Sequence, residues 1–233
     1  MKKTKIILLS ILITTEKLFC NEVQNILSNI KWLGQAGIRI EDKSIIYIDP
    51  YQLTRNAKKA DLILITHDHM DHLDRKSIEL ILKSNTIIVI PEGINFSIKD
   101  AKIEHIKPFS TNIFLGYKIT AVPAYNVKKY FHPKIKGYVG YIIEIDGKKI
   151  YHTGDTERIP EMKSLSVDII LLPLGQTYTM NSVEEAVEAV KDVKATYAIP
   201  IHFGLYEGSI EDAFKFQKLL KGKVNVLILK KEE

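Results

Sequence analysis

The sequence predicts a mixed α/β protein of layered architecture, and three observations carry this prediction. Apolar runs of strand length recur along the chain and alternate with a few amphipathic stretches of helical period. Several of these runs are apolar throughout, as expected of strands covered on both faces. The 233 residues are enough for one sizeable domain with a substantial core, and no repeat of solenoid length divides them. The residues alone therefore indicate an α/β protein with sheets and helices stacked in layers.

In the first half of the chain, strands precede and follow one helix. Residues 30–40 and 44–48 are predicted to pair as a hairpin. The apolar run 62–66 predicts a buried strand, and residues 75–83 predict a helix with one apolar side. The strand predicted at 86–90 ends at the proline that follows it.

The second half repeats this scheme with more helix. Asp146 and Gly147 form a hairpin turn signal between two strand-like runs. Ser182 and Glu185 have the spacing of a capping box and predict the start of a helix. The predicted elements are strands at 117–122, 138–145, 149–153 and 168–172, a helix from 182, a strand at 196–200, a helix at 211–220 and a last strand at 224–229.

One heptapeptide, T-H-D-H-M-D-H at residues 66–72, carries most of the functional information. Imidazole and carboxylate are ligands that zinc and similar divalent metals prefer. His67 and His69 are two residues apart, so in an extended chain they point to the same side. Asp71 and His72 follow where the chain turns from strand towards helix. Four ligands around one point are enough to serve two metals about 3.5–4 Å apart.

The heptapeptide resembles the H-x-H-x-D-H signature of the metallo-β-lactamase fold hydrolases. Three further features, in the right order, look like parts of that superfamily's ascorbate-6-phosphate-lactonase-like branch. They are K-W-L-G-Q-A-G with I-Y-I-D-P (31–37 and 46–50) as the opening hairpin, Y-H-T-G-D-T (151–156) as the segment with a bridging aspartate, and I-P-I-H-F-G (199–204) as the strand-end histidine. The match covers roughly residues 29–204 and implies a four-layer αβ/βα sandwich, the metallo-β-lactamase fold.

The resemblance also implies a dinuclear metal site. In such a site, His67 and His69 would bind the first metal, Asp71, His72 and His202 the second, and Asp155 would bridge the two. Asp71 would also act in catalysis by orienting the attacking hydroxide. The implied cofactor is zinc, as two ions, with manganese or iron as alternatives, and a site with a single metal stays open.

One position departs from the family pattern. Many relatives place a histidine after the strand before the G-D segment, in a P-A-x-H-like stretch, whereas V-P-A-Y-N places Asn126 there. An amide oxygen is a poorer zinc ligand than an imidazole nitrogen. Three outcomes stay open: a weaker first site, a site completed by water, or a site completed by His132.

The predicted activity is hydrolysis. A metal-activated hydroxide would attack an ester-type bond, such as a phosphodiester or a lactone, in a small-molecule or lipid substrate. The alternative is a metal-binding envelope protein with little or no turnover, which the missing histidine at Asn126 favours. Lys128, Lys129, Lys134 and Lys136 form a basic cluster that is either a solvated loop or a handle for an anionic substrate.

Residues 1–20 resemble a secretory signal peptide, and residues 21–233 form the predicted hydrolase domain. Lysines precede an apolar run of about ten residues, which is too short to span a bilayer as a helix. Cys20 ends the segment and is a candidate lipid-bearing cysteine. The expected location is periplasmic or lipid-anchored in the envelope, and cytoplasmic if residues 1–20 are not a signal. No transmembrane helix is expected in the mature domain.

Charge and cysteine content exclude several functions. The net charge is +5, of which residues 1–20 contribute +3 and the remainder +2, so a nucleic-acid partner is not expected. Cys20 is the only cysteine, which excludes a cysteine nucleophile, a CxxC zinc site and iron–sulfur ligation after that residue.

Other polar residues near the motifs have more than one interpretation. Asp49 and Asp68 either orient ligand imidazoles or cap loops. His152 and His105 are predicted to be structural. The stretch T-Y-T-M-N at 177–181 either contacts substrate, or covers the edge of the core and serves the turn before the next helix.

Overall fold

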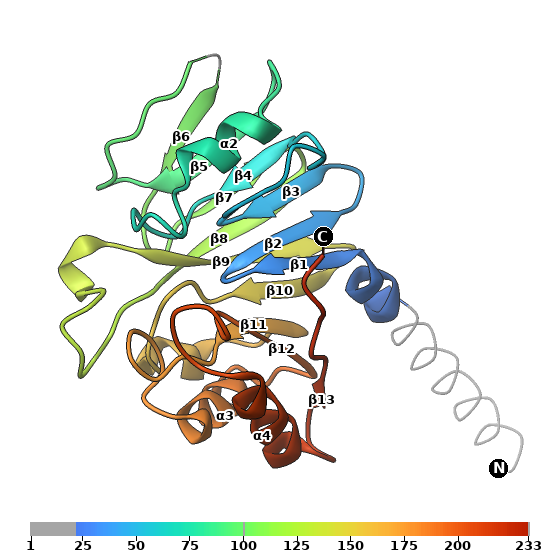
Figure 1. Ribbon diagram of the computed structural model, residues 1–233, viewed down its shortest axis with the longest axis vertical. Helices are drawn as coiled ribbons and strands as arrows, with labels where there is room; N and C mark the ends of the chain where they lie inside the picture. The colour runs from blue at the N-terminus through green and yellow to red at the C-terminus, as the bar shows by residue number, and fades with distance from the viewer. Residues whose placement is uncertain (1–21, 100, 233) are drawn as a thin grey trace, which may run out of the picture.

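The computed structural model describes residues 22–99 and 101–232, and two β-sheets form the centre of the molecule (Figure 1). The signal peptide predicted at 1–20 lies outside the described residues. Strands that are adjacent in sequence are also adjacent in each sheet. The first sheet contains β1 (Ile30–Gly34), β2 (Gly37–Glu41), β3 (Ile45–Ile48), β4 (Leu62–Leu64), β5 (Ile87–Pro91) and β6 (Lys102–Ile106). The second contains β7 (Thr111–Phe114), β8 (Tyr117–Pro123), β9 (Val139–Ile145), β10 (Lys148–His152), β11 (Ile169–Pro173), β12 (Tyr197–Ile201) and β13 (Asn225–Val226).

Both sheets are built in the same way, since each begins with antiparallel neighbours and continues with parallel ones. In the first sheet the pairs from β1 to β3 are antiparallel and those from β3 to β6 are parallel. In the second, the pairs from β7 to β10 are antiparallel and those from β10 to β13 are parallel. The carboxyl ends of β3 and β4 therefore share one edge of the first sheet, and those of β8, β10 and β12 share one edge of the second. Loops at such edges are where α/β folds place their ligands.

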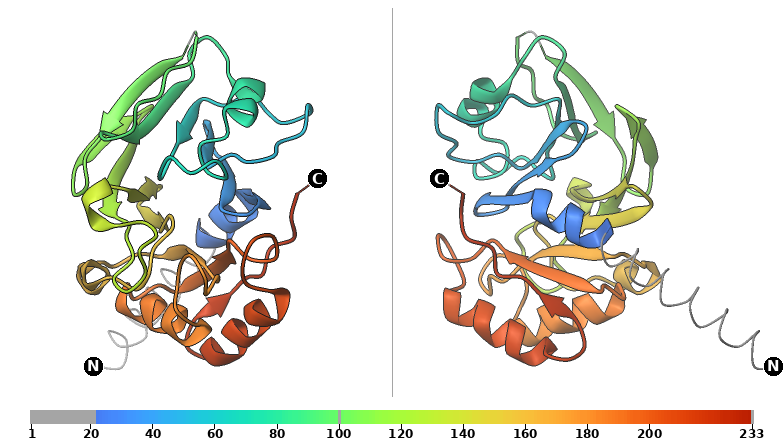
Figure 2. Two further views of the ribbon diagram at one scale, coloured as in Figure 1. Left: turned by 60° about the vertical axis from the view of Figure 1, so that its left-hand side comes forward. Right: turned by 90° about the vertical axis from the view of Figure 1, so that its right-hand side faces the viewer.

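The helices lie on the outer faces of the two sheets (Figures 1 and 2). Helix α2 (Arg75–Ile81) covers the first sheet, and α3 (Val183–Asp192) with α4 (Ile210–Leu220) covers the second. Residues 22–29 are also helical. Short 3-10 helices lie at Lys134–Lys136 and Pro160–Ser164. Within the described ranges, no helix combines the length and the apolar character needed to cross a bilayer.

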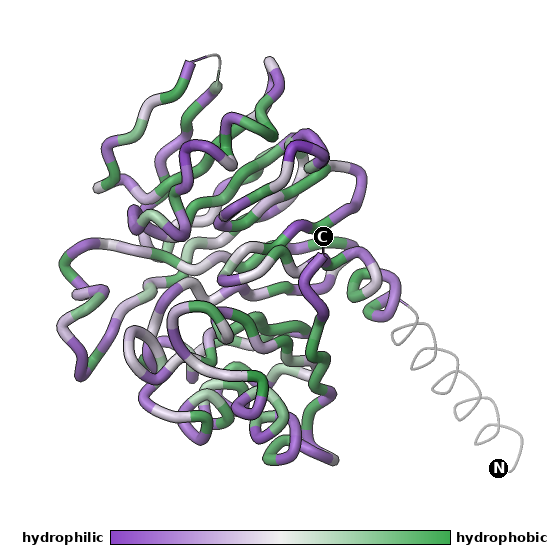
Figure 3. Tube along the Cα trace, in the orientation of Figure 1, coloured by the Kyte–Doolittle hydropathy of each residue, from purple (hydrophilic) through white to green (hydrophobic). Residues whose placement is uncertain are grey.

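Three apolar clusters separate these layers. The central cluster lies between the sheets and includes Ile38 and Leu64 from the first sheet and Ile143 and Leu171 from the second. A second cluster packs α3 and α4 against the second sheet, and a third packs α2 against the first. The strands are correspondingly hydrophobic along most of their length (Figure 3). The order helix, sheet, sheet, helix confirms the predicted four-layer αβ/βα sandwich.

Some strand boundaries differ from the predictions. The stretch predicted as one arm of a hairpin, residues 30–40, itself turns back, so β1 pairs with β2 and β3 adds a third antiparallel strand. The turn uses Gly34 at a φ of 97°, which costs glycine little because it has no Cβ. Strand β7 had no sequence signal, because it is an edge strand whose side chains are mostly exposed. The last strand is limited to β13, which is shorter than the predicted 224–229.

The capping box predicted at the start of α3 is half formed. Ser182 Oγ accepts a hydrogen bond from the Glu185 backbone N–H at 3.1 Å. The Glu185 carboxylate accepts from the backbone N–H of Asn181 instead of that of Ser182. A complete capping box occurs at Ser209 and Asp212, where it begins α4.

Candidate metal centre

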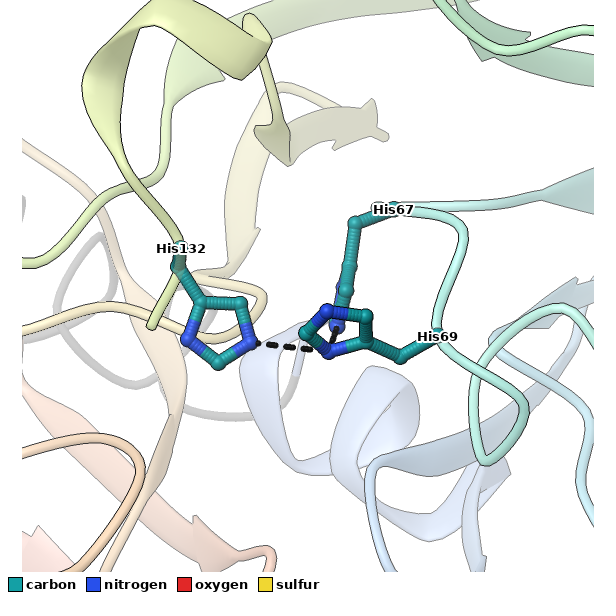
Figure 4. Close-up of side chains that lie close together, drawn as sticks. All are labelled: His67, His69 and His132. Atoms are coloured by element: carbon teal, nitrogen blue, oxygen red, sulfur yellow. Dashed lines mark hydrogen bonds between the residues drawn. The ribbon is translucent and has the colours of Figure 1, made fainter. Parts of the chain in front are cut away.

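Three imidazoles from two loops face one another in a first group of potential metal ligands (Figure 4). His67 and His69 follow strand β4, and His132 comes from the loop between β8 and β9. Nδ1 of His69 lies 3.2 Å from Nε2 of His67 and 3.2 Å from Nε2 of His132. Three imidazole nitrogens brought this close together form a donor set that suits zinc.

A second group combines one carboxylate with two imidazoles. Asp71 and His72 belong to the same segment after β4, whereas His202 follows β12 in the other sheet. Asp71 Oδ2 lies 3.5 Å from His72 Nε2 and 3.8 Å from His202 Nε2. The packing of the two sheets therefore brings the strand-end histidine onto the heptapeptide.

Asp155 lies between the two groups. It follows β10, and its Oδ2 atom is 3.2 Å from His202 Nε2 and 3.4 Å from His72 Nε2. The same oxygen is 3.4 Å from His132 Nε2 and 3.9 Å from His67 Nε2. One carboxylate oxygen thus faces four imidazole nitrogens, which is the position that a ligand shared by two metals would occupy.

His132, and not Asn126, supplies the third imidazole of the first group. The Asn126 side chain donates from Nδ2 to the carbonyl oxygen of Tyr178 at 2.7 Å. The Asn126 backbone N–H donates to the carbonyl oxygen of His132 at 3.0 Å. Of the three outcomes that the sequence left open, the geometry matches completion by His132, while Asn126 supports the loop that carries it.

Buried polar side chains behind the cluster orient its rings. Asp49 Oδ2 lies 2.7 Å from His72 Nδ1 and accepts a hydrogen bond from Thr66 Oγ1 at 2.6 Å. Thr66 Oγ1 in turn lies 2.9 Å from His67 Nδ1. Because an acceptor faces each Nδ1 atom, Nε2 is the nitrogen that points into the cluster. Asp49 therefore orients one imidazole of each group, directly or through Thr66.

The other candidates for a role near the motifs lie outside the two groups of potential ligands. Asp68 accepts a hydrogen bond from Tyr138 Oη, so its carboxylate serves a tyrosine side chain and does not share the ring-orienting role of Asp49. His152 is buried with Nε2 at 2.9 Å from the carbonyl oxygen of Ala36, as predicted for a structural histidine. His105 is exposed on β6.

Two residues without a predicted role hold the second group. Gln35, in the turn between β1 and β2, donates from Nε2 to Asp71 Oδ2 at 2.9 Å, and the same nitrogen lies 2.8 Å from His202 Nε2. Glu207 is buried, and its Oε1 atom lies 3.0 Å from His202 Nδ1. The only sequence feature that pointed to Gln35 was its place in the K-W-L-G-Q-A-G segment. For Glu207 the only such feature was its closeness in sequence to His202.

A buried carboxylate also holds the loop that carries His132. Glu157 is 1% exposed, although it belongs to neither group of potential ligands. Its carboxylate accepts hydrogen bonds from the backbone N–H groups of Val127, Lys128 and Lys129 at 2.9, 2.8 and 3.1 Å. Such charge-assisted bonds are stronger than neutral ones, so Glu157 fixes the turn from which the loop continues to His132.

The backbone of the centre is strained at four places. Gln35, Asp49, His132 and His202 have φ values of 50°, 47°, 52° and 56°. A residue with a Cβ pays roughly 1–2 kcal/mol for this left-handed conformation. Strained backbone conformations of this kind are frequent at functional sites, where contacts with the surrounding structure maintain them.

In the first group, burial keeps two imidazoles neutral. Burial, assisted by the neighbouring His72, lowers the pKa of His67 well below its ordinary value. Burial also lowers the pKa of His132 to about 4. Both rings are therefore unprotonated near pH 7 and can offer a nitrogen lone pair to a cation.

In the second group, carboxylates outweigh burial. Burial lowers the pKa of His202, but Asp155 and Glu207 more than reverse this and raise it to about 10. Burial likewise lowers the pKa of His72, and Asp155 with Asp49 raises it well above its ordinary value. Burial raises the pKa of Asp155, yet His202 and His72 hold it well below its ordinary value. The centre thus attracts positive charge, and a bound cation would take the place of these protons.

The residues present fit divalent cations. Nε2 of His72 and Oδ1 of Asp155 are buried and have no hydrogen-bond partner in the described part of the chain. An unpaired buried polar atom costs about 1–3 kcal/mol, so such atoms require an explanation. A cation bound by them supplies one. Imidazoles and carboxylates in this number suit zinc, with manganese and iron as alternatives.

A cavity of about 680 Å³ opens onto the cluster and shows how the stretch 177–181 is used. Tyr178 lines the cavity. Thr179 is buried and donates to Glu207 Oε1 at 2.9 Å, and Asn181 Nδ2 donates to Glu185 at 2.8 Å. The two interpretations of this stretch therefore apply to different residues: Tyr178 faces the site, and its polar neighbours serve the turn.

The basic cluster of four lysines does not line this cavity. Lys129 Nζ donates to the carbonyl oxygen of Met180 at 2.9 Å. Lys134 Nζ pairs with Glu161 at 2.9 Å. These positions favour a structural and solvated role for the lysines over a handle for an anionic substrate.

The chain is similar to known proteins along most of its length. The family described as Beta-lactamase superfamily domain matches residues 29–202. A UPF0173 metal-dependent hydrolase of Thermococcus onnurineus is 35% identical over 225 residues, covering 88% of this chain and 97% of that protein. A solved structure from Parabacteroides distasonis has 33% identity and a TM-score of 0.74, covering 86% of this chain and 93% of the other.

A more distant structure shares the fold. Igni18, a metallo hydrolase of Ignicoccus hospitalis, has 23% identity and a TM-score of 0.71, covering 88% of this chain and 95% of the other. The family match runs from before β1 to His202, so it spans every segment that carries a proposed ligand. The branch of the superfamily and the identity of the metal stay predictions.

Proposed function

The chain belongs to the beta-lactamase superfamily and to its UPF0173 metal-dependent hydrolases, and from this premise we propose that it hydrolyses an ester-type bond at a centre for two divalent cations. One observation carries the proposal: Asp155 Oδ2 lies within 3.9 Å of four imidazole nitrogens that come from three segments. Zinc is the proposed metal, with manganese or iron as alternatives, and the scissile bond is a phosphodiester, a lactone or a related ester.

Each group of ligands would hold one cation. The first would be bound by His67, His69 and His132, the second by Asp71, His72 and His202, with Asp155 shared between them. Divalent cations at such a pair of sites acidify water and polarise the carbonyl or phosphoryl group to be attacked. Asp49 and Glu207 supply the carboxylates that orient ligand rings from behind, which is a general feature of histidine metal sites.

Asp71 is the residue of this centre best placed to handle a proton. It lines the cavity, and Gln35 holds its Oδ2 atom by a hydrogen bond of 2.9 Å. A carboxylate that is fixed in this way and reaches the cavity can orient the attacking water and accept its proton. We therefore assign Asp71 a catalytic role in addition to ligation.

The non-enzymatic alternative, a metal-binding envelope protein with little turnover, was motivated by the missing histidine at Asn126. His132 lies beside His67 and His69, which supports completion of the first group by an imidazole and removes the motive for this alternative if His132 binds the metal. The cavity beside the cluster also leaves room for a substrate, with a volume in the range of small-molecule sites. Both observations support a hydrolase.

The test is metal content by elemental analysis together with hydrolysis of a panel of phosphodiesters, lactones and carboxylic esters. We expect about two equivalents of metal per chain, as the two-metal template requires, and activity that disappears on chelation and returns with metal. His132→Ala should lose about one equivalent and most of the activity.

His105→Ala is the matched control, because it removes an exposed imidazole on β6 that takes no part in the cluster. It should keep wild-type metal content and activity. Full hydrolysis by a preparation freed of metal would contradict the proposal, and so would wild-type metal content in His132→Ala.

A further inference from the structure

The cavity beside the metal centre has an apolar wall. Met70, Phe131, Tyr178 and Tyr206 line it together with the proposed ligands. Within the described ranges, no lysine or arginine lines it. Three of the four apolar side chains are aromatic, and they come from three separate loops, so the wall does not result from one exposed segment.

The ring pair at this wall is preformed. Phe131 and Tyr178 meet edge to face, with ring centroids 4.9 Å apart. The Tyr178 backbone is held on both sides: its N–H donates to Glu207 Oε2 at 2.6 Å, and its carbonyl oxygen accepts from Asn126 at 2.7 Å. A site formed before binding costs the ligand less ordering entropy.

The aromatic residues also adjoin the proposed ligands in the chain. Phe131 directly precedes His132, and Tyr206 directly precedes Glu207, which contacts His202. The Tyr206 hydroxyl lies 2.6 Å from that of Tyr51, so a hydrogen bond holds this ring at the cavity. A group bound against this wall would lie beside the reacting centre.

The polar part of the lining disfavours an anionic substrate. Asp68 and Asp71 line the cavity, and two lysines of the basic cluster have their charges engaged elsewhere. Lys129 donates to backbone carbonyls of the 177–181 stretch, and Lys134 pairs with Glu161. Away from the proposed metal ligands, a second anionic group on the substrate would therefore meet the carboxylate of Asp68 and no lysine or arginine among the described residues of the lining.

We propose that the substrate is a neutral carboxylic ester that carries a planar aromatic group, which packs against Phe131 and Tyr178. This inference rests on the proposed hydrolytic function and adds the substrate class. In the reaction, the oxygen of water bonds to the ester carbonyl carbon while the bond from that carbon to the alkoxy oxygen breaks. One proton of the water goes to the departing alcohol, and the other is released to solvent as the acid ionises.

Four methyl esters or diesters test the proposal with the metal-loaded protein. Methyl phenylacetate and methyl acetate differ only in the ring, monomethyl succinate adds a negative charge, and methyl phenyl phosphate is an aromatic phosphodiester. We expect kcat/KM for methyl phenylacetate to exceed that for methyl acetate about tenfold, since aromatic packing adds to the burial of the ring. Both anionic substrates should be poorer than methyl phenylacetate.

Two alanine variants test whether the aromatic wall causes this preference. Phe131→Ala and Tyr178→Ala should each reduce the preference for the aromatic ester to about twofold. The conservative variant Tyr178→Phe should keep the preference, because it keeps the ring. Phe214→Ala is the matched control, because Phe214 is an exposed aromatic residue on α4 outside the cavity. The control should keep the full preference.

Non-hydrolysable ketones separate this inference from the hydrolase proposal. Benzyl ethyl ketone and butanone replace the alkoxy oxygen of the two neutral esters by methylene, and their binding is measured by ligand-detected NMR. Binding of the aromatic ketone that depends on Phe131, without cleavage of any ester, would overturn the hydrolase proposal and support the aromatic site. Ester cleavage without an aromatic preference, or with a preference that survives both alanine variants, would overturn the substrate inference alone.

Discussion

Gln35 connects ligands that come from different sheets. Its side-chain amide contacts Asp71, which follows β4, and His202, which follows β12. Its carbonyl oxygen accepts hydrogen bonds from the His202 backbone N–H at 2.8 Å and from Trp32 Nε1 at 2.9 Å. One residue in the first turn of the fold therefore sets the spacing of the second group of ligands.

Gln35→Met keeps the length of this side chain and removes its donor. We expect kcat to fall about tenfold to a hundredfold, because a hydrogen bond to a charged group is worth about 1.5–3 kcal/mol. KM should change far less, since Gln35 does not line the cavity. Steady-state kinetics would measure both constants, with metal content determined on the same samples.

If Gln35 had a purely structural role, Gln35→Met would lower the free energy of unfolding, and kcat would not fall relative to KM. The assignment of Gln35 as a positioning residue fails if kcat is unchanged at wild-type metal content.

His132 is brought to the other proposed ligands by the way its loop folds back. The chain between Asn126 and His132 folds back on itself, so that the backbone N–H of the first residue meets the carbonyl oxygen of the second. His132 adopts a φ of 52°, which turns its ring towards His69. We therefore expect His132 to serve in place of the histidine that the family pattern has near position 126.

At the scale of elements, the loop between β8 and β9 depends on one carboxylate from another segment. Glu157 follows β10, and its carboxylate accepts three backbone hydrogen bonds from this loop. Lys129 ties the same loop to the 177–181 stretch. The loop that carries His132 is thus held in part by contacts at residues 127–129, several positions before the imidazole itself.

Glu157→Gln should loosen this loop. We expect the free energy of unfolding to fall by about 2 kcal/mol, because an amide satisfies the three N–H groups less well than a carboxylate. Backbone amides of residues 127–129 should exchange faster with solvent. Urea denaturation and hydrogen exchange would measure the two effects.

Glu188→Gln is the control on helix α3, away from this loop. It removes the pairing of Glu188 with Lys191, both of which are exposed, and surface ion pairs contribute about 0–1 kcal/mol. Equal destabilisation by the two substitutions, with no change in exchange at 127–129, would show that Glu157 has no special role in the loop.

The start of β4 is predicted to respond to acid through Asp61. Partial burial raises the pKa of this carboxyl, but Lys83 and the backbone N–H of Ile45 outweigh burial and hold the pKa below its ordinary value. A carboxyl with a lowered folded pKa contributes stability above the unfolded pKa of about 4, and loses it as the pH falls through the folded value.

Asp61→Asn should therefore lower Tm at pH 7 and lower it less at pH 3, where the wild-type carboxyl has begun to take up its proton. Calorimetry at the two pH values would measure the difference. A constant gap between variant and wild type would mean that the ionised carboxyl contributes nothing.

At the scale of the whole molecule, the proposed metal centre draws its ligands from both halves of the sandwich. The first sheet supplies the heptapeptide after β4, and the second supplies Asp155, His132 and His202 from loops after β10, β8 and β12. The apolar core between the sheets and the helices outside them do not depend on these ligands. The fold should therefore survive without metal and be stabilised by it.

Removal of the metal should lower Tm without abolishing cooperative unfolding. A ligand present at about a thousand times its Kd stabilises the folded state by about 4 kcal/mol, which corresponds to roughly 8–16 °C for a domain of this size. Calorimetry with and without chelator would measure the shift. A Tm that is the same in both conditions would argue against cations bridging the two sheets.

The sequence by itself determined the features that depend on neighbours along the chain. Apolar runs predicted most strands and helices, because a strand or helix with one buried face has apolar residues at the regular spacing of that element. His67, His69, Asp71 and His72 were identifiable because they lie in one segment, whose backbone geometry alone brings their side chains together. Asp155 and His202 were proposed from short motifs at expected strand ends.

Only the tertiary structure decided which distant side chains complete and support the centre. The choice between Asn126 and His132 depends on how a loop folds back, and the roles of Gln35, Glu157 and Glu207 depend on contacts between segments far apart in the chain. Contacts between distant segments produce no regular pattern of residues that could be recognised in the sequence. They arise when two sheets pack face to face and bring the carboxyl ends of their strands to a common edge, because burial of the shared apolar core then fixes where each loop must lie.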